Sequence, residues 1–291
     1  MLQSRRPTLS VAAALCAALL TGCHLLQPIA TALRNPKNLF DASAENELPP
    51  IVASRDAISL ELVFIERQVG DPLLGRALWN DVDQVGVMQP ETRARLASNG
   101  FRVGHVGPTP PQALQTLLKL TDDALDLGNP SDSSRAMQIR RVTLTSDMET
   151  EVHAAPQYAE CLVRVVGSAG ETERSFTQAL CQFRLKARRL QEGWAQIELT
   201  PEILHSRSAM RHVVAKNQWQ LQQGKKHAPL YDQKFTVRLN KGEMAVVTAA
   251  PANPGSLGHT FFRGPQADSH VQRLLVIRLA DIQQVKPVYA E

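Results

Sequence analysis

The sequence predicts an α+β fold: a small α/β lobe followed by a larger antiparallel β sandwich or partly closed barrel. Strand and helix signals alternate over residues 56–128. From residue 138 onward, short segments alternate between apolar and polar side chains, and Gly, Pro, Asn and Ser separate them. Because no long helical pattern lies between these later segments, we expect neighbouring strands to pair in antiparallel fashion.

The first lobe is predicted to contain two strands and three helices. Residues 58–64 alternate between apolar and polar side chains, as in a half-buried strand, and residues 101–106 form a second, shorter strand. Each helix is expected to begin at a proline, whose missing N–H group is tolerated in the first turn. The three predicted starts are Asp71-Pro72, Pro90-Glu91 and Thr109-Pro110, and Asn99-Gly100 ends the second helix.

The second region is predicted to consist of strands joined by tight turns. Gly167 to Gly170 and Gln191 to Gly193 have the composition of hairpin connections. The candidate strands are residues 138–146, 149–153, 158–167, 175–190, 194–200, 212–222, 233–239, 243–249 and 271–280.

The composition excludes several classes of protein. Of the 291 residues, 43% are hydrophobic and 21% charged, which is typical of one or two globular domains and not of a disordered chain. Only 5% are aromatic, so few rings are present to stack on bases. Removing Arg5 and Arg6, which lie in a segment expected to be cleaved, from the 32 basic residues leaves 30 against 28 acidic ones. We therefore expect no nucleic-acid partner.

Residues 1–22 have the features of a secretory signal peptide. Arg5 and Arg6 precede a mostly apolar stretch from Leu9 to Leu20. Twelve helical residues rise about 18 Å, whereas a bilayer core is about 30 Å thick, so this stretch is too short to span a membrane. One interpretation of this segment is an ordinary secretory signal that has a cysteine at its end by chance.

The segment Leu20-Thr21-Gly22-Cys23 resembles the lipobox of bacterial lipoproteins. The resemblance implies cleavage between Gly22 and Cys23, a diacylglycerol on the Cys23 thiol and an acyl chain such as palmitate on the new amino group. Two or three chains would anchor the protein durably in a membrane. Because His24 follows the cysteine, where many inner-membrane lipoproteins have aspartate, the resemblance favours a periplasm-facing location on the outer membrane.

The mature chain is predicted to have three parts. Residues 23–54 contain four prolines and show no sustained helical or strand periodicity of apolar side chains, which indicates a lipidated tether. Residues 55–130 form the small α/β lobe and residues 131–291 the antiparallel β region. The sequence leaves open whether these two regions are independent domains or share one sheet.

Cys161 and Cys181 are the remaining cysteines of the mature chain. If the strands around them form a hairpin centred near Glu171, the two residues lie opposite each other and can form a disulfide in an oxidising compartment. The alternative is a pair of buried, reduced cysteines that pack as small hydrophobic residues. Their role is structural in both cases.

No catalytic, cofactor-binding or metal-binding pattern is found in the sequence. His205 and His212 are seven residues apart, and HxxxH, HxH and CxxC spacings are absent. Gly255-Ser256-Leu257-Gly258-His259 differs from the GxSxG nucleophile motif and lies in a turn-rich segment. We therefore predict a protein that is not an enzyme and that has no metal or cofactor. A hydrolase with dispersed residues near His205 and His212 is a third-ranked alternative.

Three segments of the β region resemble the β domain of secretins, the ring-forming outer-membrane proteins of secretion and pilus systems. They are Ala195–Ile203, Leu239–Val247 and Leu274–Leu279. The resemblance implies a shared scaffold or a secretion-accessory role and not a channel, because no Gly-Gly-Leu follows residues 244–249. As a whole the chain resembles bacterial envelope lipoproteins, which implies no particular activity.

Together these observations predict a non-catalytic, protein-binding or scaffolding component of an envelope assembly, anchored to the membrane through its lipid. The alternative is a lipoprotein that binds a small ligand or glycan, which predicts a single deep apolar pocket with a few polar groups. Charge is uneven: residues 41–91 hold 10 acidic and 3 basic residues, whereas residues 184–227 hold 9 basic and 3 acidic ones. This asymmetry is compatible either with docking to a charged partner or with ordinary solvated faces.

Overall fold

The computed structural model describes residues 55–120, 137–167, 170–215, 218–251, 254–265 and 270–285, all of which belong to one compact unit. The predicted signal peptide, cleavage site and tether lie outside the described residues. The first of two antiparallel sheets has the strand order β2-β10-β11-β1-β3. Its strands are β1 (Arg55–Gln68), β2 (Phe101–Val106), β3 (Met137–Thr145), β10 (Met244–Ala249) and β11 (Val271–Val285).

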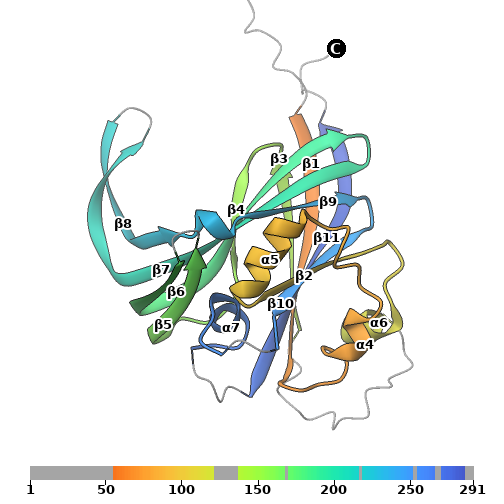
Figure 1. The fold of residues 1–291 in the computed structure, drawn as a ribbon. Coiled ribbons are helices and arrows are strands. Elements are labelled where there is room, and N and C mark those ends of the chain that lie inside the picture. The colour runs from red at the N-terminus through yellow and green to blue at the C-terminus, as the bar shows by residue number, and fades with distance from the viewer. Residues whose placement is uncertain are drawn as a thin grey trace, which may run out of the picture. The chain divides into compact units, whose positions relative to one another are not determined.

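The second sheet has the order β4-β6-β7-β8. Its strands are β4 (Glu149–His153), β6 (Gly170–Gln191), β7 (Trp194–Ala215) and β8 (Gln218–Pro229). Two more strands extend it: β5 (Tyr158–Gly167) pairs with the first half of β6, and β9 (Phe235–Asn240) pairs with the first half of β7. Mostly antiparallel strands with a small helical part confirm the predicted α+β class (Figure 1).

The two sheets meet at one corner, where a short turn joins β3 to β4. There Arg140 Nη1 donates a hydrogen bond to the carbonyl oxygen of Glu151 at 2.9 Å. At the other end of the strand order, β9 and β2 are edge strands that do not pair with each other. The two sheets therefore form a barrel that is closed on one side only, with a seam between β9 and β2.

The central strands β10 and β11 of the first sheet are buried on both faces. Successive residues of β11 alternate between two hydrophobic clusters: Leu275 and Ile277 pack into the core between the sheets, whereas Leu274 and Val276 pack on the outer side. The core between the sheets also contains Phe183 and the other inward residues of β6 and β7. A strand buried on both faces contributes to two cores, which explains why β10 has six buried residues in succession.

Within the described residues, five short helices cover the sheets. They are α4 (Arg76–Trp79), α5 (Pro90–Ser98), α6 (Gln112–Leu117), η2 (Tyr231–Gln233) and α7 (Leu257–Phe262). Leu78 and Trp79 of α4 and Leu114 of α6 fill the outer cluster of the first sheet. The first predicted helix is shortened to turns followed by α4, although Asp71 does accept the backbone N–H of Leu73 as expected of a cap (2.8 Å). The sequence did not predict α7.

The predicted lobes share a sheet. β1 and β2, from residues 55–130, pair with β11 and β10, from residues 131–291. Strands from the beginning and the end of the described chain therefore lie side by side, as Figure 1 shows for β1 and β11.

Two strand predictions differ most from the observed strands. Residues 212–222 are not one strand but the end of β7 and the start of β8. The prediction missed this break because the intervening Lys216-Asn217 contains neither glycine nor proline. β7 also continues through Pro201, where the prediction ended it. The Pro201 carbonyl accepts the N–H of Leu230, so the proline nitrogen faces the same side of β7. On that side Pro201 lies between the residues of β7 that pair with β9, which end at Leu199, and those that pair with β8, which start at Glu202. The missing N–H therefore removes no ladder bond at this position.

Candidate functional site

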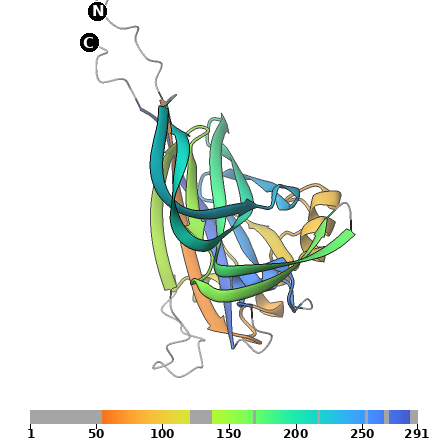
Figure 2. The same cartoon turned by 90° about the vertical axis from the view of Figure 1, so that its left-hand side faces the viewer.

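At the far end of the β7–β8 ribbon the two strands, among the described residues, pair only with each other. β7 pairs with β6 only as far as Leu204, whereas residues 209–215 pair with residues 218–224 and with no other described strand. We call residues 209–224 the arm. In Figure 1 it curves away beyond β5 and β6, and in Figure 2 that side faces the viewer. Both edges of the arm thus present backbone N–H and C=O groups that a further strand can pair with.

A β-bulge marks the base of the arm. Between the pairs His205↔Lys226 and Ala209↔Gly224, three residues of β7 lie opposite Lys225 alone. Ser206, inside the bulge, has a left-handed backbone conformation with φ of 67°. A bulge bends its strand, so it turns the arm out of the sheet at this point.

Lys225 ties the base of the arm to the body. Its Nζ donates hydrogen bonds to the carbonyl oxygen of Gln178 at 3.0 Å and to Oε1 of Gln157 at 2.6 Å. The His205 ring also packs against Phe176, with ring centroids 5.1 Å apart. The base is therefore fixed on β6 and on the segment before β5.

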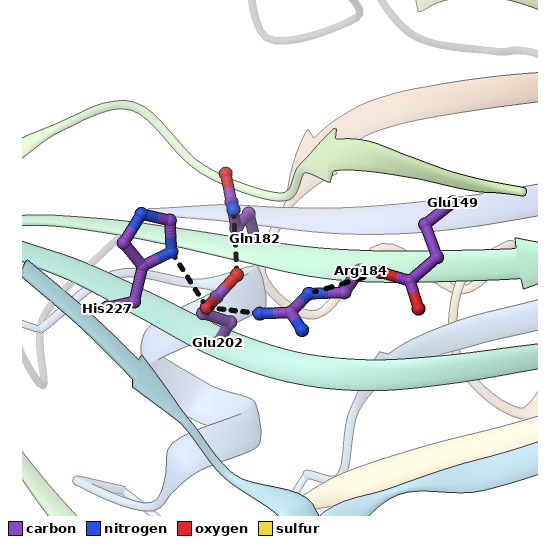
Figure 3. A network of polar contacts seen from close by, with 5 residues as sticks. All are labelled: Glu149, Gln182, Arg184, Glu202 and His227. Atoms are coloured by element: carbon purple, nitrogen blue, oxygen red, sulfur yellow. Dashed lines mark hydrogen bonds and ion pairs between the residues drawn. The ribbon is translucent and has the colours of Figure 1, made fainter. Parts of the chain in front are cut away.

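A charged network lies just inside this base (Figure 3). We call it the Glu202 cluster, and its members are Glu149, Gln182, Arg184, Glu202 and His227. Oε1 of Glu202 accepts hydrogen bonds from Arg184 Nη2 at 2.7 Å and from His227 Nδ1 at 3.0 Å, and Oε2 accepts one from Gln182 Nε2 at 3.0 Å. Arg184 Nε also lies 3.8 Å from a carboxylate oxygen of Glu149. The cluster thus joins β4, β6, β7 and β8.

The strand register explains how these side chains meet. Gln182 lies directly opposite Glu202, and their neighbours Phe183 and Ile203 face the core. Because side chains alternate along a strand, Gln182 and Glu202 share the opposite face of the sheet. Glu202 is nevertheless only 1% exposed, since Arg184 and the β8 residue His227 close over it.

The Glu202 carboxylate is ionised at neutral pH. Burial alone would raise its pKa, but hydrogen bonds from Gln182 and His227 and the charge of Arg184 outweigh burial and lower the pKa. The same carboxylate raises the pKa of Arg184 against the effect of burial. Both carboxylate oxygens have donors, so this group is suited to holding strands together and not to accepting a proton from a substrate.

A second feature, which we call the seam cleft, opens between β9 and the segment of residues 83–92 and has a volume of about 700 Å³. His105 Nε2 lies 3.1 Å from Glu243 Oε2 at its edge. Asp83 accepts the N–H groups of Val85 and Gly86, and these bonds lower its pKa. The cleft is open and lined mainly by polar side chains, unlike the deep apolar pocket expected of a small-ligand site.

The seam cleft contains one histidine–carboxylate pair. Among the described residues, no hydroxyl or thiol group hydrogen-bonds to His105, so the pair lacks the nucleophile that a hydrolytic triad requires. Half-buried Trp194 and exposed Arg238 line the opposite side of the cleft. This arrangement is suited to recognising a polar ligand beside an aromatic ring.

The described structure holds Cys161 and Cys181 as free, buried residues. The predicted register is wrong: Cys161 of β5 lies opposite Phe176, and Cys181 of β6 lies opposite Ile203. The hairpin closes at Gly167 and Gly170, so its centre lies two to three residues before Glu171. Burial raises the pKa of Cys161 to about 11 and that of Cys181 well above its usual value, so both thiols are protonated at neutral pH.

The histidines considered as a dispersed site come from separate parts of the fold. His205 and His212 lie on β7 on either side of the bulge, and His259 lies on α7. Within the described ranges, no group of three or more His, Cys, Asp or Glu side chains is arranged to hold a metal ion. None of the helices in this part of the chain is both long and apolar enough to cross a bilayer. The predicted lipidation site Cys23 and the predicted cleavage position Gly22 lie outside the described residues.

The sequence matches no protein-family model and no curated protein sequence. Among solved structures, the chain is similar to the type IV competence pilus secretin PilQ of V. cholerae, with 11% sequence identity. The alignment covers 84% of this chain and 62% of the secretin, so the chain spans less than two thirds of that protein's length. The TM-score of 0.20 is too low to establish a common fold.

Proposed function

We propose that this protein is a non-catalytic, protein-binding component of a bacterial envelope assembly, held at the outer membrane by a lipid on Cys23. The arm is the observation that carries the proposal. A two-stranded ribbon is marginally stable by itself in water, and residues 209–215 and 218–224 pair only with each other. Such a ribbon gains stability when a partner strand adds to one of its edges.

The base of the arm supports this role. The Glu202 cluster and Lys225 fix the direction in which the arm leaves the body, so the arm is held in position for a partner. A fixed binding element loses less conformational freedom on association than a flexible loop does. The predicted lipid anchor at Cys23 would add to this by confining the protein to the membrane surface where an envelope assembly forms.

A site-specific photocrosslinker tests the proposal in intact cells. We would place a photoreactive amino acid at Met210, which is 58% exposed in the arm, or at Leu162, which is 56% exposed on β5. Their matched exposure makes Leu162 the control for nonspecific capture. A discrete adduct with another envelope protein from position 210 alone, lost in Cys23→Ala, supports the proposal. Equal labelling from both positions, or none from position 210, contradicts it.

A glycan-binding function is the second candidate, and the seam cleft favours it. Trp194 presents an aromatic ring there among polar side chains that include Gln196 and Arg238. Titrating the full chain with N-acetylglucosamine oligomers while following tryptophan fluorescence tests this function. A saturable change that disappears in Trp194→Phe supports it, whereas an unchanged signal rejects this class of glycan.

A further inference from the structure

A second cleft of about 700 Å³ lies between the start of β5, the end of α7 and the start of β11. Its polar lining includes the hydroxyl group of Tyr158 and the guanidinium groups of Arg263 and Arg273. We call these three residues, together with Gln272 and Thr248 behind them, the Arg263 cluster. None of them belongs to the arm, the Glu202 cluster or the seam cleft.

A buried relay of hydrogen bonds fixes the Arg263 side chain. Arg263 Nη2 donates to Gln272 Oε1 at 2.6 Å, and Gln272 Nε2 donates to Thr248 Oγ1 at 3.1 Å. The Thr248 hydroxyl in turn donates to the backbone carbonyl of Arg273 at 2.6 Å. Gln272 and Thr248 are both buried, so the amide has one orientation and the guanidinium is held in place.

Two donor groups of this cluster lack acceptors. Arg263 Nε is buried and makes no hydrogen bond to any described residue, and the buried Tyr158 hydroxyl has beside it the guanidinium of Arg273, which is itself a donor and leaves the O–H proton without an acceptor. No described carboxylate pairs with Arg263, because Glu66 pairs with Arg273 at 2.6 Å and Glu160 is exposed at the rim. Burial lowers the pKa of Arg263, as expected of a desolvated cation without a counter-ion. An arrangement of this kind is costly unless something compensates the charge.

We propose that this cleft binds an oxyanion, the phosphate or carboxylate group of a small molecule or of a lipid headgroup. An oxyanion can accept hydrogen bonds from both Arg263 Nε and the Tyr158 hydroxyl, which satisfies the two unpartnered donors at once. A guanidinium group suits this task, because its planar fork donates to two oxygen atoms. Arg273 adds a second positive charge at the same cleft and keeps Glu66 as its own partner.

Inorganic phosphate is the first probe, added to the full-length lipidated protein in maltoside micelles. The phosphorus NMR linewidth of phosphate reports binding, and acetate and soluble short-chain phosphatidylglycerol serve as competitors. We expect saturable line broadening that weakens about tenfold or more in Arg263→Gln, since a charge-assisted bond is lost. Tyr158→Phe should weaken binding by about threefold to tenfold. Arg238→Gln is the matched control, because Arg238 is an exposed arginine of the other cleft.

The competitors separate the sources of the oxyanion. Competition by acetate assigns the site to carboxylates as well, and competition by phosphatidylglycerol but not by phosphatidylcholine assigns it to an anionic lipid headgroup. If Arg263→Gln does not fold, Tyr158→Phe and Arg263→Lys provide the same comparison. The absence of saturable binding of all three anions overturns the proposal. An equal loss in Arg238→Gln overturns it as well.

Discussion

The Glu202 cluster and the Arg263 cluster both place charged side chains against the sheets, but they differ in how the charge is compensated. Glu202 receives three hydrogen bonds and has the guanidinium of Arg184 as its counter-ion. Among the described residues, Arg263 has the neutral amide of Gln272 as its hydrogen-bond partner, and its Nε makes no hydrogen bond to any of them. The Glu202 carboxylate is therefore compensated by its neighbours, whereas the Arg263 guanidinium has room for an anionic partner.

Whether neighbouring groups compensate a buried charge is a physical criterion that separates structural polar groups from ligand-binding ones. A carboxylate whose oxygens all have donors stabilises the fold by itself. A desolvated cation without a counter-ion is stable only if the rest of the fold supports it or if a ligand supplies the missing charge. The two clusters should therefore respond differently to the loss of the Glu202 carboxylate and of the Arg263 guanidinium.

Removing the Glu202 carboxylate should have the largest effect on stability. Glu202→Ala leaves the buried Gln182 amide and the Arg184 guanidinium without their acceptor, and we expect a loss of about 3 kcal/mol in the free energy of unfolding. Urea denaturation measures this loss. Glu149→Ala is the matched control, because Glu149 is half-exposed and 3.8 Å from Arg184, and it should cost less than about 0.5 kcal/mol. Equal costs for the two variants would show that the buried cluster is not a distinct structural element.

Displacing α7 should destabilise the second cluster more selectively. A Cβ atom on Gly258 would overlap the backbone carbonyl group of Gly100, so Gly258→Ala must shift α7, which ends next to Arg263. We expect a loss of about 2 kcal/mol, as for overpacked sites, and weaker phosphate binding. Gly107→Ala is the control, since a Cβ at Gly107 meets nothing within 4 Å. Unchanged phosphate binding in Gly258→Ala would separate α7 from the Arg263 cluster.

The sequence predicted the strands well but not α7, for a physical reason. Period-two alternation identified most strands to within a few residues, as for β9, because its side chains alternate between the core and the solvent side of the sheet. All six residues of α7, Leu257 to Phe262, are buried, so this helix has no exposed face. Its sequence therefore lacks the alternation of apolar and polar faces that identifies a surface helix. Its one local signal is Ser256, whose hydroxyl accepts the N–H of His259 at 3.3 Å.

The two clusters could not be predicted from spacing. Tyr158, Arg263 and Gln272 come from three different elements, and only the closure of the two sheets brings them to one cleft. Alternation along β7 does predict that Glu202 lies on the polar face. Its burial depends on His227, whose side chain reaches Glu202 from the neighbouring strand β8. The sequence therefore indicates the orientation of such a residue but not what covers it.

The stability supplied by Glu202 should depend on pH in a defined direction. Its pKa in the folded protein lies below the ordinary value of 4.5, so its contribution is present above that pH and is lost as the pH falls toward the folded value. Urea denaturation of the wild type and of Glu202→Gln at pH 7, 5, 4 and 3 should show a difference that narrows below about pH 4.5. The difference between the wild type and Arg263→Gln should stay constant over this range. A Glu202→Gln difference that does not change with pH would mean that the carboxylate is not preferentially ionised by folding.

Replacing Arg263 should have the smallest effect on stability. Methionine has a similar length and no charge, so Arg263→Met removes an uncompensated, desolvated cation and leaves apolar volume in its place. Without added anions we expect the free energy of unfolding to stay within about 1 kcal/mol of the wild type, in contrast to Glu202→Ala. With saturating phosphate the wild type should gain stability and the variant should not, because only the wild type binds the anion. If Arg263→Met is instead as unstable as Glu202→Ala, the guanidinium already has a counter-charge in the folded protein, and the oxyanion site loses its main support.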